Sequence, residues 1–511
     1  MNSTIFQNVR LLALDRSNSE YDAVDVRIKG STIDELGQDI AVGPDDLVID
    51  GAGKLLMPGL INGHFHSPGS FNRGALDDMP LELFMLYEVP PFDCPPTSAR
   101  MHYLRTLLGA VEMLKGGVTS VHDDPFYVPT VTEELTNATM QAYSDAGLRA
   151  TVSINTPNVV EYHKYPFLFE LLPDIFRRKM EEIVQPTKDE LIATYRRFIS
   201  SWHGANNGLL QTSVSCSAPQ RVTKEYLRAL ADLSGEHDLP YNMHILETRL
   251  QRVFGDQLLG RSLVRYVHDE GVLDERSLVI HAIWVDEDDM DLLAASGCSV
   301  AHNPLCNLKL GSGIMPFRAL TERGVNICLG SDEMCSDDSV NLWNVAKLAG
   351  LVHKITEPDY RRWPTAQEIL NCATLNGARA MRQERSTGSI EAGKQADLIL
   401  IDLDTLAFSP LNDLRRQLVF CENGSSIRLV MVAGDIVVSD GKVLSIDEEA
   451  LKEEIRESWK MYQQQYEQVD HWARTLEPIY RKMYEHSLAE PVGPTRALSY
   501  GDLRSRPKGA L

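Results

Sequence analysis

The chain has 511 residues and a formal net charge of −22. This charge argues against a nucleic-acid or anionic-membrane partner, because phosphate groups repel an acidic surface. Hydrophobic residues make up 43% of the chain, but no stretch approaches the roughly 18 apolar residues that a membrane helix needs. The eight cysteines form no CxxC pair, which predicts buried free thiols in a reducing compartment. We therefore expect a cytoplasmic protein that acts on a small molecule.

Both ends of the chain contain short strand-like segments separated by turn residues. IFQNVRLLAL and DAVDVRIKG occur early, and ADLILIDLD and SSIRLVMVAGDIVVSDGKVLS occur late. Their alternating apolar residues are typical of β-strands. We predict that residues 1–58 and 386–445 pair into one small β-sandwich domain around a long insertion.

The insertion, residues 59–385, alternates apolar strand-like runs with amphipathic helical stretches. GGVTSVHDD, PYNMHILE, RSLVIHA and VNICLGSD are among the strand-like runs. Such alternation predicts a parallel sheet, either open or closed into a barrel. The absence of GxGxxG and GxxxxGK[ST] loops weakens the nucleotide-binding open-sheet alternative.

Residues 446–511 are predicted to form a helix followed by a tail. Ser445 and Glu448 fit a capping box at the start of this helix. Apolar residues then recur at spacings of three and four, as helical packing requires. They are Leu451, Ile455, Trp459, Tyr462, Tyr466, Val469 and Trp472. We expect this stripe to pack against the rest of the chain or against another subunit, whereas residues 491–511 show no periodicity.

The segment LMPGLINGHFHSPG carries the sharpest chemical signal. His64 and His66 lie two residues apart, so on a strand both imidazoles point to the same face. They can then share one metal ion at ~2.0–2.1 Å. The alternative, a pair of unrelated surface histidines, is disfavoured by the apolar run that precedes them.

Three further strand-like runs end in residues that can bind a metal or move a proton. His244 follows YNM, His281 follows SLVI, and Asp332 follows VNICLGS. In a barrel these strand ends form the mouth of the active site. Glu247 comes three residues after His244, where the strand should give way to a loop. For Asp332 the structural alternative is a cap of the next helix.

Three imidazoles and one carboxylate suit a borderline divalent ion such as zinc or ferrous iron. A bound metal lowers the pKa of its water from 15.7 toward ~7 and so generates hydroxide at neutral pH. Asp332 can take the water proton as general base, and Glu247 can carry a proton to a ring nitrogen or leaving group. His281 can hydrogen-bond the attacking water or the developing oxyanion.

These segments resemble a known family. PGLINGHFH, HILETR, VIHA, AHNPLCNLKLGSGIMP and GVNICLGSDE occur in the order found in the amidohydrolase superfamily. They are most similar to its aminohydrolase and chlorohydrolase branch, which includes deaminases of guanine, S-adenosylhomocysteine and pterins, and s-triazine hydrolases. The resemblance implies a distorted (β/α)8 TIM barrel over residues 59–385, the composite β-sandwich domain and a homo-oligomer.

The resemblance also implies a role for each site residue. The expected ligands of one divalent metal, with zinc favoured over ferrous iron, are His64, His66, His244 and Asp332. Glu247 is the expected proton shuttle, and His281 is expected to contact the substrate or the water. Relatives place residues near the substrate at the positions of Arg73, His302 and Asn303. A surface role for Arg73, and structural roles for His302, Asn303 and Asn307, remain open alternatives.

The sequence departs from these relatives in ways that leave the substrate open. The strand-four segment QTSVSCSAPQ has no lysine, whereas binuclear relatives use a carbamylated lysine there, so we expect one metal. Close relatives often have Pro-His-Ala-Pro where this chain has Cys216-Ser217-Ala218-Pro219. After Asp332 the chain continues Glu333-Met334-Cys335 rather than with a Gly-Ala-type stretch.

We therefore expect hydrolytic deamination of an amino-substituted N-heterocycle by metal-bound hydroxide, with release of ammonia. Alternatives in the same class are displacement of chloride or an alkylamine from a triazine, and opening of a cyclic amide. A catalytically inactive scaffold is the alternative from another class, but such proteins lack the metal-binding histidines.

Overall fold

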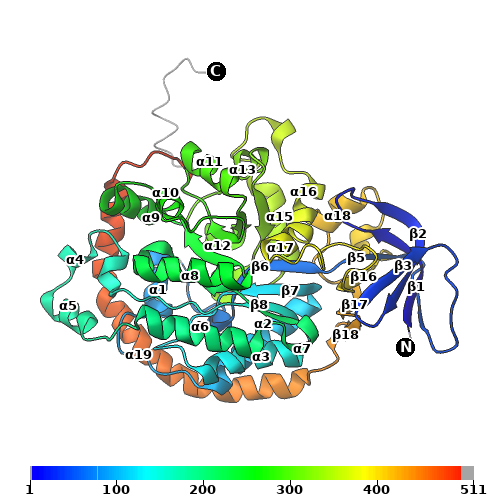
Figure 1. Cartoon of the computed structure of the whole chain (residues 1–511), viewed down its shortest axis with the longest axis horizontal. Helices are drawn as coiled ribbons and strands as arrows, with labels where there is room; N and C mark the ends of the chain where they lie inside the picture. The colour runs from blue at the N-terminus through cyan, green and yellow to red at the C-terminus, as the bar shows by residue number, and fades with distance from the viewer. Residues whose placement is uncertain (1–2, 78, 497–511) are drawn as a thin grey trace.

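Parallel strands form a closed barrel at the centre of the molecule, which a computed structural model describes over residues 3–77 and 79–496 (Figure 1). The barrel strands are β6 (Leu60–His66), β7 (Val118–Asp123), β8 (Arg149–Val152), β9 (Leu210–Thr212), β10 (Val214–Ser215), β11 (Tyr241–Ile245), β12 (Ser277–His281), β13 (Ser299–His302), β14 (Asn326–Leu329) and β15 (Asp332–Glu333). They are buried along nearly their whole length, because helices cover their outer face, as is usual for parallel sheets.

Two of the eight barrel positions hold an interrupted strand, and both interruptions help to close the barrel. At the fourth position β9 pairs with β8 and β10 pairs with β11, so hydrogen bonding changes sides at Ser213. At the eighth position β14 pairs with β13, and β15 pairs with β6. The expected distorted (β/α)8 barrel is therefore confirmed.

Helices surround the barrel. They include α2 (Ala99–Lys115), α3 (Glu133–Ala146), α6 (Lys188–Trp202), α8 (Lys224–His237), α10 (Leu263–Asp269), α11 (Glu287–Ser296), α13 (Phe317–Glu322), α15 (Leu342–Val352), α16 (Ala366–Cys372) and α17 (Leu375–Ala380). Several begin at a threonine or aspartate whose side chain accepts a backbone N–H of the first turn, such as Thr187 before α6 and Asp286 before α11. These caps satisfy N–H groups that a helix start otherwise leaves unpaired.

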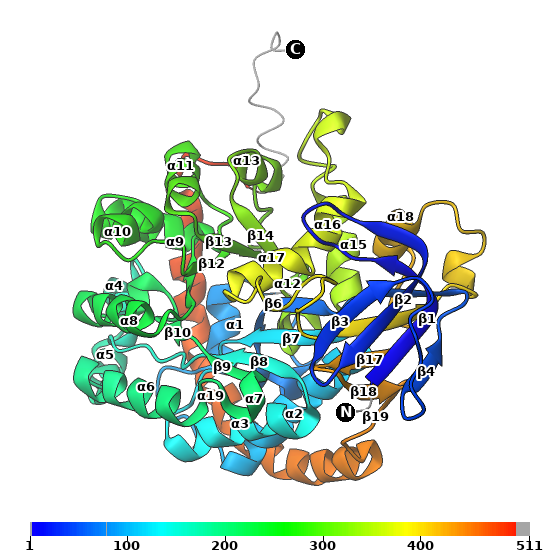
Figure 2. The same cartoon turned by 45° about the vertical axis from the view of Figure 1, so that its right-hand side comes forward.

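Strands from both ends of the chain form one nine-stranded sheet beside the barrel (Figure 2). Its strands are β1 (Ser3–Leu12), β2 (Glu20–Lys29), β3 (Thr32–Gly37), β4 (Leu47–Asp50), β5 (Lys54–Pro58), β16 (Leu398–Asp402), β17 (Ile427–Val432), β18 (Asp435–Ser439) and β19 (Lys442–Val443). The two ends meet where β5 runs antiparallel to β16, with Met57 opposite Ile399. The sheet thus joins segments that are more than 300 residues apart in the chain.

The long helix α19 (Glu448–Ala489) lies along the outside of the barrel (Figure 1). It packs on α1 (Leu81–Glu88), α2, α4 (Leu168–Leu171) and α9 (Arg249–Phe254). Its aromatic stripe faces this chain's own barrel, since the Tyr462 hydroxyl donates to Asn72 Oδ1 at 2.8 Å. Of the predicted tail, residues 491–496 are described, and residues 497–511 lie outside the described part.

The predicted capping box at the start of α19 is wrong. Asp447, not Ser445, is the N-cap, and its carboxylate accepts the backbone N–H groups of Glu449 and Ala450. The Ser445 hydroxyl instead donates to the carbonyl of Ala146 at 3.2 Å. The physical reason is a tertiary contact: the Ser445 hydroxyl, which the local sequence pattern predicts as the helix cap, is hydrogen-bonded to the end of α3 instead.

Two other expectations concern the thiols and the membrane. All eight cysteines are free, and six of them are buried, whereas Cys94 is half-buried and Cys421 is exposed. Within residues 3–77 and 79–496, no helix combines the length and the apolar character needed to cross a membrane.

Candidate metal centre and active site

Four imidazoles and one carboxylate meet at the carboxyl ends of the barrel strands. His64 and His66 come from β6, His244 from β11, His281 from β12 and Asp332 from β15. All five side chains are buried. The parallel barrel brings these distant segments together because all its strands end at the same rim.

The ring nitrogens and the carboxylate surround a common point. His244 Nε2 lies 3.2 Å from both His64 Nε2 and His66 Nε2. Asp332 Oδ1 lies 3.6 Å from His64 Nε2 and 3.7 Å from His66 Nε2. Ligands at ~2.0–2.1 Å from a tetrahedral zinc ion lie roughly 3.3 Å from one another. The donor separations therefore fit a shared divalent ion.

Hydrogen bonds behind two of the rings fix which nitrogen faces the centre. His66 Nδ1 lies 2.6 Å from the carbonyl of Asp124, and His244 Nδ1 lies 2.7 Å from the carbonyl of Ser217. Since a carbonyl only accepts, each Nδ1 carries the proton and each neutral ring presents a bare Nε2. Ring-orienting partners of this kind are usual behind metal-binding histidines.

Protonation at the centre also suits a cation. Burial lowers the pKa of His64, and it lowers the pKa of His244 well below the ordinary value, so both rings stay neutral. Burial alone would raise the pKa of Asp332, but the neighbouring His64 and His281 hold it well below its usual range. Neutral imidazoles and a carboxylate are the forms that bind a metal.

Glu247 and His281 lie next to this centre. His281 Nε2 is 3.5 Å from Glu247 Oε2 and 3.6 Å from Asp332 Oδ2. Burial, followed by the charge of Asp332, raises the pKa of Glu247 well above its ordinary value. Burial lowers the pKa of His281 to about 4. The pKa values of Glu247 and Asp332, on either side of His281, are thus shifted in opposite directions.

Backbone strain is concentrated at the same strand ends. The φ angle is +62° at Ser217, +54° at Leu246, +76° at His281 and +60° at Asp332. These left-handed conformations are unfavourable for residues with a Cβ, and they persist where the surrounding structure enforces them, often at functional sites.

The structure places the residues predicted near the substrate in different surroundings. Asn303 lies near the centre, with Nδ2 3.5 Å from Asp332 Oδ2. Asn307 orients His281, because its Oδ1 lies 2.9 Å from His281 Nδ1. His302 faces His353 instead, with Nε2 atoms 3.0 Å apart. Neither Asn303 nor His302 is among the residues that line the cavity in front of the centre.

Arg73 is also absent from the cavity wall. Its guanidinium pairs with Glu112 at 2.6 Å, and its side chain is 37% exposed. This pairing agrees with the surface alternative for Arg73. The ion pair holds the side chain on α2, outside the cavity lining.

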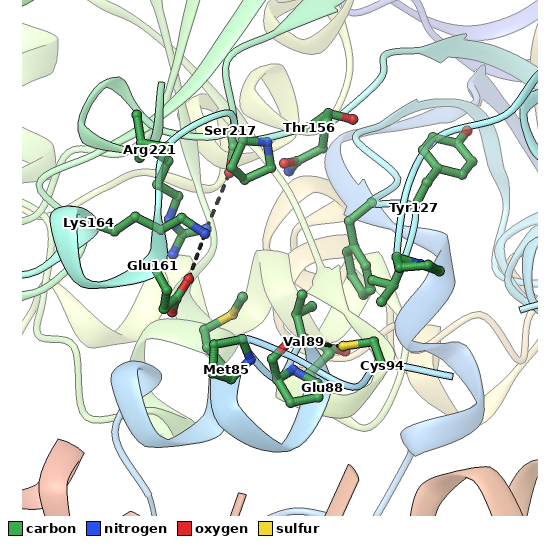
Figure 3. A pocket seen from close by; sticks show the side chains of 18 of the residues that line it. Met85, Glu88, Val89, Cys94, Tyr127, Thr156, Glu161, Lys164, Ser217 and Arg221 are labelled. Carbon is green, nitrogen blue, oxygen red and sulfur yellow. Dashed lines mark hydrogen bonds and ion pairs between the residues drawn. The ribbon is translucent and has the colours of Figure 1, made fainter. Parts of the chain in front are cut away.

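A cavity of about 680 Å³ opens in front of the centre (Figure 3). Its floor includes His66, His244, His281, Glu247 and Asp332. Its walls come from α1, from the loop after α1 and from residues 155–194, which include η2 (Glu161–Lys164) and α5 (Asp174–Glu181). The volume is in the range of small-molecule sites.

Sequence reasoning missed several cavity residues, among them Glu88, Lys164 and Arg221. It also missed Asp124, whose carbonyl orients His66. The pair Asp123-Asp124 ends the strand-like run GGVTSVHDD, so the strand-end argument used for Asp332 could have found it. Glu88 and Lys164 had no such signal, because they lie on segments whose position depends on packing.

The fold and the metal-suited centre together define a metal-dependent hydrolase of the barrel type, and comparisons with known proteins agree. The sequence of residues 55–437 matches the amidohydrolase family. The chain belongs to this family. It is therefore a hydrolase that acts on carbon–nitrogen bonds, as the resemblance implied.

Several relatives are similar over nearly their whole length. The chain is 30% identical to a 5'-deoxyadenosine deaminase of Methanosarcina mazei over 463 residues, which cover 90% of this chain and 98% of the relative. It is 29% identical to a 5-methylthioadenosine/S-adenosylhomocysteine deaminase of Thermoanaerobacter pseudethanolicus, over 87% of this chain and 96% of that one.

Solved structures share the fold. An adenosine deaminase from Xanthomonas campestris with bound zinc superposes with a TM-score of 0.79 at 23% identity, covering 92% of this chain and 99% of that chain. An atrazine chlorohydrolase from Arthrobacter aurescens TC1 complexed with zinc gives a TM-score of 0.80 at 22% identity, covering 88% and 98%.

Proposed function

We propose that this protein hydrolytically removes the amino group of an amino-substituted N-heterocycle of the adenine type and releases ammonia. The observation that carries the proposal is the placement of two carboxyl groups beside His281 Nε2, Glu247 at 3.5 Å and Asp332 at 3.6 Å. Burial shifts the pKa of Glu247 well above its ordinary value, whereas the neighbouring histidines hold the pKa of Asp332 well below its own. Titratable groups whose pKa values are pushed apart in one site are the usual acid and base of a reaction. The deaminase names of the relatives support this choice of leaving group.

His64, His66, His244 and Asp332 are the proposed ligands of a single divalent ion, with zinc favoured over ferrous iron. When bound, such an ion supplies a lowered pKa for water and a positive charge that stabilises developing negative charge. The separations of 3.2, 3.2, 3.6 and 3.7 Å between donor atoms support this set. His281 also lies close enough to His64 and His244 to be tested as a ligand.

Each side chain then has a defined task. Asp332 accepts a proton from the attacking water as its oxygen adds to the carbon that bears the amino group. Glu247 donates a proton to the adjacent ring nitrogen. His281, with its Nδ1–H donated to Asn307, presents a bare Nε2 that accepts a hydrogen bond from the water. The carbon–nitrogen bond then breaks as Asp332 returns the proton from water to the amino nitrogen, which leaves as ammonia. The added hydroxyl loses its remaining proton to Glu247, so that the ring keeps a carbonyl and Glu247 regains the proton that it gave to the ring nitrogen.

Ammonia release by the metal-loaded protein tests this proposal. The panel comprises adenosine and its 5'-modified analogues, together with amino-substituted pterins, pyrimidines and triazines. We expect ammonia from at least one adenine compound, and loss of that release after treatment with a chelator. Ammonia from none of them, with about one metal bound per chain, would instead indicate a halide or alkylamine leaving group.

A further inference from the structure

One wall of the cavity carries two basic side chains. Among the described lining residues, Lys164 and Arg221 are the only lysine or arginine. Figure 3 shows both near Ser217 and Glu161, on the side of the cavity opposite Tyr127. They come from different segments, Lys164 from η2 and Arg221 from the end of η3 (Pro219–Arg221), directly after β10.

The two cations differ in how their charge is balanced. Lys164 Nζ lies 2.6 Å from Glu161 Oε2, and the second oxygen of Glu161 accepts from the Tyr480 hydroxyl at 3.2 Å. Arg221 has no carboxylate oxygen within 4.0 Å in the described part of the chain. Its Nη1 donates to Ser217 Oγ at 3.2 Å, and its guanidinium also interacts with the Tyr165 side chain. Arg221 therefore lines the cavity without a close ion pair, and its charge acts only at longer range on the buried carboxyl groups of Glu82 and Glu247.

Burial raises the pKa of Glu82 and the charge of Arg221 lowers it, but no ion pair within 4.0 Å joins these two described residues. Glu82 is buried and accepts from the Thr248 hydroxyl at 2.5 Å. Burial is the larger of the two influences on the pKa, which favours the neutral form of Glu82. A guanidinium presents five N–H donors in a planar fork that matches the two oxygens of a carboxylate or phosphate.

Arg221 also lies close to the reacting centre. Ser217, which accepts from Arg221 through its hydroxyl, accepts from His244 Nδ1 through its backbone carbonyl. Arg221 follows Ser217 by four residues and reaches back to its hydroxyl.

We propose that Arg221 is a specificity-determining residue that binds an anionic oxygen group, a carboxylate or a phosphate, on the substrate. The inference rests on the proposed function, because it places that group on the same molecule as the heterocycle. A substrate with such a group supplies the close ion-pair partner that Arg221 lacks among the described residues.

The test compares three nucleosides that differ only at the 5' position: adenosine, adenosine 5'-carboxylic acid and adenosine 5'-monophosphate. Ammonia release gives kcat/KM for each with wild type, Arg221→Met and Arg221→Lys. For one of the anionic nucleosides, we expect Arg221→Met to lower kcat/KM relative to that for adenosine by roughly tenfold to a hundredfold. This is the usual effect of losing a charge-assisted hydrogen bond. The loss should fall on KM, and Arg221→Lys should restore part of it. The nucleoside that responds identifies the carboxylate or the phosphate.

Arg228→Met is the matched control, since it removes the same charge seven residues later. Arg228 pairs with Glu270, is about half exposed and does not line the cavity. We expect it to leave both ratios within twofold of wild type. The proposal is overturned if Arg221→Met lowers kcat/KM equally for all three nucleosides. It is also overturned if wild type turns over adenosine but neither anionic nucleoside.

Failure of the proposed function has a different signature. If no nucleoside releases ammonia, the deaminase proposal fails by itself. Arg221 is then tested by calorimetric titration with inorganic phosphate. Wild type must bind it at least tenfold more tightly than Arg221→Met, and equal binding or no binding overturns the proposal.

Discussion

The Nε2 atoms of His66 and His244 face each other at 3.2 Å, while the Nδ1–H group of each ring donates to a backbone carbonyl. Two bare nitrogens at this distance cannot hydrogen-bond to each other. Their lone pairs repel unless a cation lies between them. This relationship is the strongest structural argument for a metal at the centre.

His66→Ala should abolish metal binding and activity together, because it removes one of the converging donors. The measurement is metal content per chain beside ammonia release. His471→Ala, an exposed position on α19, is the control and should change neither. Full metal occupancy in His66→Ala would refute the ligand assignment.

Glu247→Gln should keep the metal and lose most of the turnover. The amide preserves the size of the side chain but cannot give up a proton, and proton transfer of this kind contributes typically 10²–10⁴-fold. Metal content and kcat are measured on the same preparation. Near-normal kcat in this variant would show that Glu247 is not the proton shuttle.

Gly330→Ala should weaken both the fold and the metal site. A Cβ at Gly330 would lie 2.4 Å from Asn303 Oδ1 and 2.8 Å from His64 Cβ. Overpacking of this kind costs typically 1–3 kcal/mol, and here it pushes on a proposed ligand. Gly37→Ala is the control, because its Cβ would meet only Ile40 at 3.7 Å. A chelator-competition assay should find weaker metal binding in Gly330→Ala alone, and equal affinity in both variants would contradict this account.

His353 should contribute to loss of stability in acid. Burial, followed by the charge of Arg318, lowers its pKa from 6.5 to about 3. The unfolded chain therefore takes up a proton below pH 6.5 that the folded chain refuses until about pH 3, so stability falls as the pH falls through this window. Between pH 7.5 and pH 5 this contribution is about 2 kcal/mol.

Urea unfolding of wild type and His353→Gln at both pH values measures that contribution. The free energy of unfolding should fall by about 2 kcal/mol less between pH 7.5 and pH 5 in His353→Gln than in wild type. This difference does not depend on how much the substitution destabilises the protein at pH 7.5. His302 Nε2 lies 3.0 Å from His353 Nε2, and burial, followed by the charge of His353, lowers the pKa of His302, so the comparison reports on this pair of rings. An unchanged difference would show that His353 does not carry the effect.

The sequence by itself predicted a parallel sheet and the polar residues that end its strands, and the resemblance to the amidohydrolase superfamily implied that the sheet closes into a barrel. Apolar runs that end in His244, His281 or Asp332 predict parallel strands, and parallel strands in a closed barrel must deliver their last side chains to one rim. The spacing of His64 and His66 fixes their common face. The parallel strands and the common face of the two histidines followed from local periodicity and strand direction, whereas closure into a barrel came from the resemblance.

Only the tertiary structure decided the cavity wall and the partners of individual side chains. Arg73 pairs with Glu112 on α2, His302 faces His353, and Ser445 contacts α3 rather than capping its own helix. Arg221 and Lys164 share a wall although 57 residues separate them in the chain. The physical reason is that strand ends are positioned by a repeating backbone geometry, whereas side chains on loops and short helices are positioned by packing between segments far apart in the sequence.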